Sequence, residues 1–231
     1  MNSVIAEIGK KELKTTFRSK SIIIPLLMGI GIPLFAGLFV ILQLAVEGLE
    51  FIYTPLLFLQ VLPAVIITAL VGLNAFSNEI YWRTIKSLLV APVSDKEIFI
   101  GKSLACIVPG LIVEACLAVI ILILLPIAVD IPILIILLAI GPLLVMFATF
   151  MIIAATSRFP SSAAAGVGAA SFIPMIAIVA VFLLCLFLQT LLQMNPIALQ
   201  VMIALITAAL TFMTYFIATK WFNRERLVTG L

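Results

Sequence analysis

The chain has 231 residues, of which 65% are hydrophobic and 10% are charged, and its formal net charge is +3. An ordinary soluble domain is excluded, because a chain of this length and composition would expose far too much apolar surface in water. The absence of histidine removes the usual general base and most zinc sites, and the small positive charge does not indicate nucleic-acid binding.

Residues 3–20 are predicted to form an amphipathic helix on the membrane surface. Their apolar side chains share one broad helical face and the charged ones lie opposite, with Glu12 as the exception. A signal peptide fits poorly, because the apolar run that follows is long and has no small-residue cleavage pattern. A mitochondrial targeting segment stays open, although Glu7 and Glu12 count against it.

Six apolar stretches are long enough to cross a bilayer, which takes about 20 helical residues. They cover about 21–44, 55–77, 103–125, 133–156, 161–188 and 197–221. The short loop with Glu47 and Glu50 and the turn 126–132 with Asp130 carry no cation, so both are placed outside. Every Lys and Arg lies near the N-terminus, in 78–102, at Arg158 or in the tail, so both termini are placed in the cytoplasm.

The predicted fold is an all-α integral membrane protein with six transmembrane helices. Residues 1–231 then form a single transmembrane domain, because six spans leave no room for a folded soluble domain. The three cysteines lie inside apolar runs, which favours small buried hydrophobic side chains over a disulfide framework.

Residues 78–102 form a long polar interruption in this apolar chain. Between Asn78 and Leu89 the aromatic and aliphatic side chains fall on one helical face, which predicts a helix lying flat at the membrane interface. Pro92 ends that helix, and Ser94 with Glu97 forms a capping box that starts a second helix running into the third span. The loop is interpreted as a docking surface for a soluble partner, with a solvated connector as the alternative.

The loop residues also follow a recognisable order of a Glu, a Thr, a Leu pair, Pro-x-Ser and Gly-Lys. They are Glu79, Thr84, Leu88, Leu89, Pro92, Val93, Ser94, Ile98, Gly101 and Lys102. This order resembles the loop signature of ABC-2 type transporter permeases, and the hydropathy layout extends the resemblance over the whole chain. Arg83 stands where that family usually has Gly, and Lys86 stands where it often has an acid.

The resemblance implies the transmembrane permease subunit of an ABC exporter, a non-catalytic membrane chain that moves substrate by alternating access. A separate ATP-binding subunit would supply the energy, so the chain itself would bind no cofactor, and the permease would pair with a second copy or a homologous permease. The loop would be the cytoplasmic coupling helix between spans two and three, and part of 180–196 would be re-entrant. The coupling contacts would be Glu79, Arg83, Thr84, Lys86, Leu88, Leu89 and Pro92.

The chain does not carry a nucleotide-binding loop of its own. Gly101, Lys102 and Ser103 look like the end of one, but the pattern requires a Gly five residues earlier, where Lys96 stands. ATP hydrolysis is therefore expected on a partner chain.

Glu114 lies near the middle of the third predicted span, and an ionisable group at that depth indicates a substrate or proton path. The alternative is a protonated or hydrogen-bonded side chain inside the bundle. In the fifth span, small residues at four-residue spacing predict close helix packing, within this chain or against a second copy. They are Ser162, Ala164, Gly166, Gly168 and Ala170.

Two other classes of function are the alternatives. An autonomous channel or secondary transporter would use Glu114 as its central group. A membrane-embedded enzyme is disfavoured, because the chain has no histidine and its spans hold no Ser–Lys or paired-carboxylate arrangement. The predicted partners are the ATP-binding subunit, another permease and membrane lipids. The predicted location is the cell membrane. The sequence does not identify the transported substrate.

Overall fold

The computed structural model describes a helical protein. The described residues are 6–11, 14, 31, 61, 63–72, 94–124, 130–159, 173, 176–177, 179–181, 183–184, 187–188 and 195–222. Every described residue with regular secondary structure is helical. The all-α class predicted from the sequence is therefore confirmed for this part of the chain.

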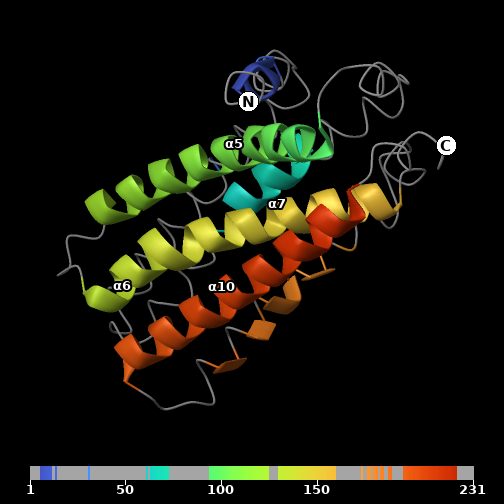
Figure 1. Ribbon diagram of the computed structural model, residues 1–231. Coiled ribbons are helices and arrows are strands. Elements are labelled where there is room, and N and C mark those ends of the chain that lie inside the picture. Colours follow the sequence, from blue (N-terminus) through green and yellow to red (C-terminus); the bar gives the residue numbers. More distant parts are fainter. Residues whose placement is uncertain are drawn as a thin grey trace.

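Three long helices dominate the described structure (Figure 1). The first is α5 (Asp95–Leu124), and the last is α10 (Pro196–Trp221). Between them α6 (Ile131–Ile135), the π-helical segment η2 (Ile136–Ile140) and α7 (Gly141–Arg158) follow without a break. All three are long and apolar enough to cross a membrane.

These helices match three of the six predicted spans. The predicted spans 103–125, 133–156 and 197–221 fall within or close to the observed helices, which extend further at their polar ends. In the second predicted span a shorter apolar helix, Pro63–Gly72, is described. Of 161–188 only separate helical residues are described, and of 21–44 only Gly31. A count of six spans therefore goes beyond the described structure.

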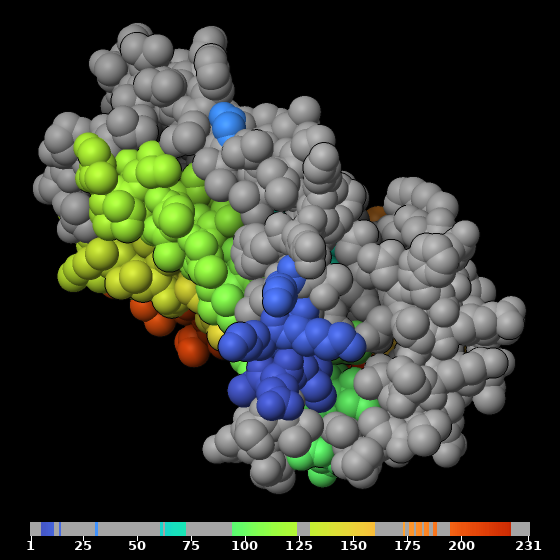
Figure 2. Space-filling model, turned by 90° about the horizontal axis from the view of Figure 1, so that it is seen from above, coloured from blue at the N-terminus to red at the C-terminus, as the bar shows by residue number. Residues whose placement is uncertain are grey.

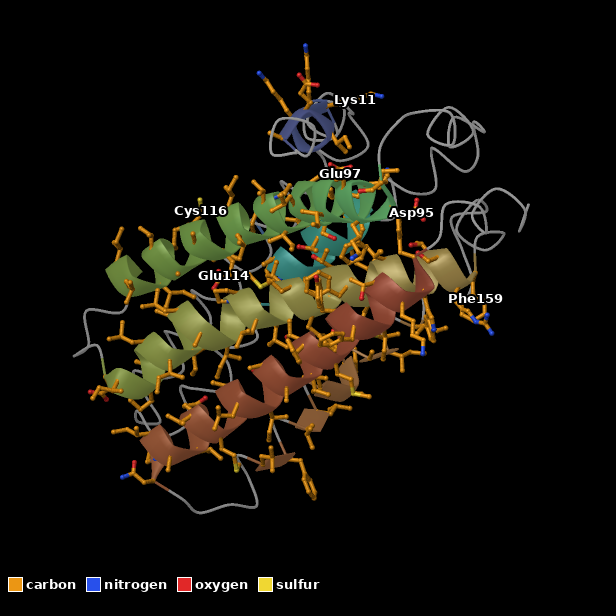
Figure 3. All side chains as sticks on the ribbon, in the orientation of Figure 1. Lys11, Asp95, Glu97, Glu114, Cys116 and Phe159 are labelled. Carbon is orange, nitrogen blue, oxygen red and sulfur yellow. The ribbon has the colours of Figure 1, made fainter. Side chains whose placement is uncertain are left out.

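Helix α5 runs antiparallel to the two other long helices. In Figure 1, α5 runs one way and α6–α7 and α10 run the other way. The start of α5 therefore lies beside the ends of α7 and α10, and Asp95 and Phe159 mark this shared end in Figure 3. Helix α10 packs along α7, η2 and α6, and α5 packs along α7.

The interruption by η2 was not expected from the sequence, which predicted one regular span over 133–156. Gly141 and Pro142 follow the π-helical segment directly. A proline ring clashes with the carbonyl four residues earlier and removes one backbone donor, so the preceding turn must rearrange. A wider π turn accommodates that change while the span continues.

Polar and apolar side chains are distributed in the reverse of a soluble protein. Large aliphatic and aromatic residues stand exposed along the outer faces of the long helices, such as Ile123, Leu138 and Leu205. Buried polar residues occur on all three helices and on the Pro63–Gly72 helix. This is the arrangement expected of helices surrounded by lipid, where the apolar surface needs no cover from water.

Gly110 allows a close approach between helices. A Cβ atom at this position would clash with the Oγ1 of Thr68 and would lie 2.8 Å from the Cγ1 of Val145. The absence of a side chain therefore lets α5 meet both the Pro63–Gly72 helix and α7. Pro109, the residue before Gly110, lies inside a continuous α5.

The N-terminal helix lies against the start of α5. Residues 6–11 are helical and fall within the range 3–20 of the predicted amphipathic helix, of which only Lys14 is described beyond them, so the full helix goes beyond the described residues. Gly9 is buried, and a Cβ atom there would lie 3.7 Å from the carbonyl oxygen of Gly101. Figure 2 shows this segment, in blue, against the green surface of α5.

Candidate functional site

The predicted coupling residues are not among those that the structure describes. Glu79, Arg83, Thr84, Lys86, Leu88, Leu89 and Pro92 all fall outside the described residues, and so do the small residues Ser162, Ala164, Gly166, Gly168 and Ala170. The described site therefore begins at the last part of the loop, where Ser94 leads into α5.

The capping box predicted at this point is confirmed. The backbone N–H and the hydroxyl of Ser94 donate to the Oε2 atom of Glu97, at 2.9 and 2.8 Å. In return the Glu97 N–H donates to the Ser94 hydroxyl oxygen at 3.3 Å. Two orphan donors of the helix start are thus satisfied by neighbouring side chains, which fixes where α5 begins.

The charge of Glu97 is stabilised by the same contacts. Glu97 lies in the polar first turn of α5, ahead of the apolar, membrane-facing part of the helix. Hydrogen bonds from the backbone and then from the side chain of Ser94 lower the pKa of its carboxyl below the ordinary value. The carboxylate is therefore kept ionised near the positive end of the helix dipole.

An aromatic cluster joins this start of α5 to the two other long helices. The ring centroid of Phe99 lies 6.3 Å from Phe150 on α7 and 6.0 Å from Tyr215 on α10. The ring of Phe222, just after α10, lies 5.6 Å from Phe99, and Phe150 and Tyr215 are 5.2 Å apart. Offset and edge-to-face contacts of this kind are each worth about 0.5–1.5 kcal/mol beyond burial. The start of α5 at Ser94 is thus followed, within the first two turns of the helix, by a ring that packs against α7 and α10.

Sequence reasoning missed this cluster. Its signal was present, because Phe99 stands just before the third predicted span, and Phe150 and Tyr215 stand near the same predicted membrane face of the fourth and sixth. Aromatic residues near span ends are also expected at the headgroup belt, so spacing alone does not distinguish the two roles. The rings come together only because the start of α5 packs beside the ends of α7 and α10.

The described cations gather at the same end of the bundle. They are Lys10, Lys11, Lys14, Lys96, Lys102, Arg158 and Lys220. The guanidinium carbon of Arg158 lies 6.0 Å from the ring centroid of Trp221, so the last turns of α7 and α10 are linked by a cation–π contact. At the opposite end the helix starts carry Asp130 and the uncharged Asn195.

Glu114 is buried inside the bundle, with 4% of its surface exposed. Figure 3 shows it on the side of α5 that faces the other helices, while Cys116 lies on the opposite side. This buried position agrees with the alternative of a side chain inside the bundle, and the substrate or proton path stays a prediction. Cys106 is buried as expected, but Cys116 is exposed on the apolar outer face and does not fill the core.

The buried face of α10 mixes polar and apolar side chains. Its polar members are Gln200, Thr207, Thr211 and Thr214, and its apolar members are Leu199, Ile203 and Ala218. Each threonine hydroxyl donates to a carbonyl of its own helix, and Thr211 also donates to the Leu143 carbonyl oxygen of α7 at 3.1 Å. Leu199 and Ile203 pack in the hydrophobic core with residues of η2 and α7, so polar and apolar contacts together hold α10 in place.

Two buried polar groups on these helices lack hydrogen bonds. Within the described residues, neither Nε2 nor Oε1 of Gln200 has a hydrogen-bond partner, and the Ser157 hydroxyl on α7 has none. Burial of an unpaired amide in an apolar interior costs about 1–3 kcal/mol in proteins. Such a group in a native fold calls for a specific role.

No group of three or more acidic, Cys or His side chains that would hold a metal ion occurs among the described residues. No protein-family model, no curated protein and no solved structure matches this chain.

Proposed function

We propose that this chain is the permease subunit of an ABC-2 type transporter, an exporter in the cell membrane. It has six spans and works with a separate ATP-binding subunit. A second copy or a homologous permease completes the transporter, which moves substrate by alternating access. ATP binding closes the partner subunits, the loop 78–102 moves, and the spans rearrange.

The capped start of α5 is the observation that carries this proposal. The reciprocal hydrogen bonds between Ser94 and Glu97 fix the angle at which the loop enters the helix. Phe99 then passes any displacement of this end to α7 and α10, because its ring packs on both. A flexible loop would absorb such a displacement by changing its own conformation. A capped helix with a tightly packed aromatic residue moves as a rigid unit and passes the displacement on.

The distribution of charge supports a cytoplasmic position for the coupling end. The described cations gather around the starts and ends of α5, α7 and α10 at this end. Positively charged residues near span ends favour the cytoplasmic side. In this orientation the N-terminal helix beside Gly101 lies on the inner leaflet, next to the docking loop.

Purification from native membranes tests the proposal. The full-length tagged chain is extracted in mild detergent, and the co-purified chains are identified by mass spectrometry and assayed for ATP hydrolysis. We expect a subunit with a nucleotide-binding loop and ATPase activity. The double variant Arg83→Glu with Lys86→Glu should reduce its recovery, because it reverses the charge of the docking helix.

The matched control is Asp130→Lys, a charge reversal at the opposite end of the bundle, which should leave recovery unchanged. If the wild-type chain purifies without any ATP-hydrolysing subunit, the proposal is wrong. Equal loss of the subunit in both variants would mean that the loop is not the docking surface.

A second candidate is an autonomous channel or secondary transporter, and the burial of Glu114 in the bundle favours it. Purified chain alone in liposomes, with a membrane potential imposed and a pH-sensitive dye inside, would then conduct protons. Glu114→Gln should abolish that flux. No flux above empty liposomes would exclude this candidate.

A further inference from the structure

The described part of the N-terminal helix has two different faces. Gly9 is buried, and a Cβ atom there would lie 3.7 Å from the carbonyl oxygen of Gly101 on α5. At about 100° per residue, Lys10 and Lys11 project about 100° and about 160° away from Gly9. Both are exposed, and Lys14 is also helical and exposed. The helix therefore packs its glycine side against α5 and presents a lysine face, made of Lys10, Lys11 and Lys14, to its surroundings.

The lysine face carries a net positive charge. Glu7 also projects about 160° away from Gly9 and is exposed, so the described face holds three cations and one anion. Glu97 lies one turn before Gly101 on α5, on the glycine side of the N-terminal helix, and its carboxylate accepts hydrogen bonds from Ser94. The chemistry of the face therefore fits an anionic partner.

The contact with Gly101 fixes the depth of this face in the membrane. Helix α5 holds four charged residues in 95–102, but residues 103–113 contain none. Gly101 thus lies where the polar start of α5 meets its apolar part. This boundary corresponds to the junction between the headgroup layer and the hydrocarbon core. The N-terminal helix therefore lies at the level of the headgroups.

The lysine face lies beside the bundle and not at its end. In Figure 1 the N-terminal helix lies on the side of α5 that is turned away from α7 and α10. Figure 2 shows the same segment, in blue, at the surface of the molecule. At headgroup depth the side of a membrane bundle is surrounded by lipid, whereas a soluble partner meets the end of the bundle.

We propose that Lys10, Lys11 and Lys14 form a binding surface for anionic lipid headgroups. Their ammonium groups act as point charges toward phosphate oxygens, and the long lysine stems let them reach those oxygens from the bilayer surface. A headgroup with a net negative charge, such as phosphatidylglycerol, is preferred over phosphatidylcholine, which is neutral overall. The inference goes beyond the proposed function and does not rest on it, since no ATP-binding subunit takes part.

Competition between two lipids tests this surface on the full chain. The chain is purified in a non-ionic detergent and incubated with an equimolar mixture of dioleoyl phosphatidylglycerol and dioleoyl phosphatidylcholine. Native mass spectrometry then gives the ratio of the two lipids that stay bound. The test variant combines Lys10→Gln, Lys11→Gln and Lys14→Gln, and a second variant places Arg at the same three positions to keep the charge.

One lysine near an anionic bilayer surface strengthens the attraction about 5-fold. The glutamine variant should therefore lower the ratio of bound phosphatidylglycerol to phosphatidylcholine at least about 10-fold, and the arginine variant should keep it. An unchanged ratio in the glutamine variant would overturn the proposal, and so would a wild-type chain that binds the two lipids equally.

The matched control removes three exposed cations from other parts of the same end of the bundle. It combines Lys96→Gln, Arg158→Gln and Lys220→Gln. The lipid ratio should fall much less in this control than in the glutamine variant. An equal fall would overturn the proposal, because the preference would then come from the general positive charge of this end.

Hydrogen exchange on the wild-type chain gives a second readout, which decides the result if the glutamine variant elutes as an aggregate. Peptides from residues 3–20 should exchange more slowly in nanodiscs of the equimolar lipid mixture than in nanodiscs of phosphatidylcholine alone. Peptides from α10 should not change. Equal exchange of residues 3–20 in the two lipids would overturn the proposal.

Discussion

The two ends of the helix bundle are built differently. At the end where α5 starts, a reciprocal capping box, an aromatic cluster and a cation–π contact join three helices. At the other end α6 and α10 begin with prolines in the first turn and rely on local contacts, such as the 3.0 Å bond from the Ile197 N–H to Asn195 Oδ1. We therefore expect the first end to move as one unit, and the helices at the second end to separate more easily.

The largest effect should follow the removal of the Phe99 ring. Phe99→Ala deletes a buried side chain that contacts α7, α10 and Phe222, and such changes cost about 3–5 kcal/mol in protein cores. Unfolding in mixed detergent micelles, followed by circular dichroism, measures this loss.

Phe212→Ala is the matched control, because Phe212 is also aromatic but is exposed on the outer face of α10. It should cost much less than Phe99→Ala. Equal losses would mean that the cluster is not what unites the three helices at this end.

The contact halfway between the two ends is tested by Gly110→Ala. The added methyl group would meet the Thr68 hydroxyl and the Val145 side chain, and overpacking of this kind costs about 1–3 kcal/mol. Gly9→Ala is the control, because its Cβ would make only an ordinary 3.7 Å contact with Gly101. Both are compared by thermal unfolding in detergent.

A second substitution identifies the atom responsible. Thr68→Ala removes the hydroxyl that the new methyl group would meet, so the double variant Gly110→Ala with Thr68→Ala should recover part of the lost stability. Additive losses in the double variant would contradict the close approach of the two helices at this level.

Length and hydropathy were enough to predict the long helices, because about 20 apolar residues in a row have few alternatives to a membrane helix. The capping box was predictable as well, since Ser94 and Glu97 interact within one turn of chain. Local chemistry of this kind is readable from neighbouring residues.

Contacts between distant segments were not readable in this way. Phe99, Phe150 and Tyr215 meet only because α5 lies against α7 and α10, and nothing in their own segments fixes that arrangement. The unpaired amide of Gln200 was overlooked for the same reason, because burial depends on the neighbouring helices. Pro142 did carry a local signal for the π-helical segment, but a proline in a span is compatible with several distortions.

The caps at the two ends offer a direct comparison. Ser94→Ala removes the hydroxyl from the capping box, and Asn195→Ala removes the acceptor of the Ile197 N–H; each change should cost about 1 kcal/mol. Hydrogen exchange should rise in the first turn of α5 for one variant and of α10 for the other. If exchange increases in all three long helices for Ser94→Ala but not for Asn195→Ala, the end where α5 starts behaves as one unit. An equally wide increase for the two variants would contradict this.

The two caps should also differ in their response to pH. The lowered pKa of Glu97 means that its cap contribution is complete above the ordinary pKa of glutamate and is lost as pH falls through the lowered value. The cap at Asn195 has no titratable group. After correction for the intrinsic pH dependence of amide exchange, acidification should therefore lower the protection factors at the start of α5 and leave those at the start of α10 unchanged.

The smallest expected effect concerns the hydrogen bond that links α10 to α7. Thr211→Val keeps the shape of the side chain but removes its bond to the Leu143 carbonyl, and interhelical bonds in membranes average about 0.6 kcal/mol. Thr214→Val is the control, because Thr214 is equally buried and donates only within its own helix. Unfolding in mixed micelles should show a loss for Thr211→Val and almost none for Thr214→Val. Equal losses for the two variants would mean that the bond to the Leu143 carbonyl does not stabilise the packing of α10 on α7.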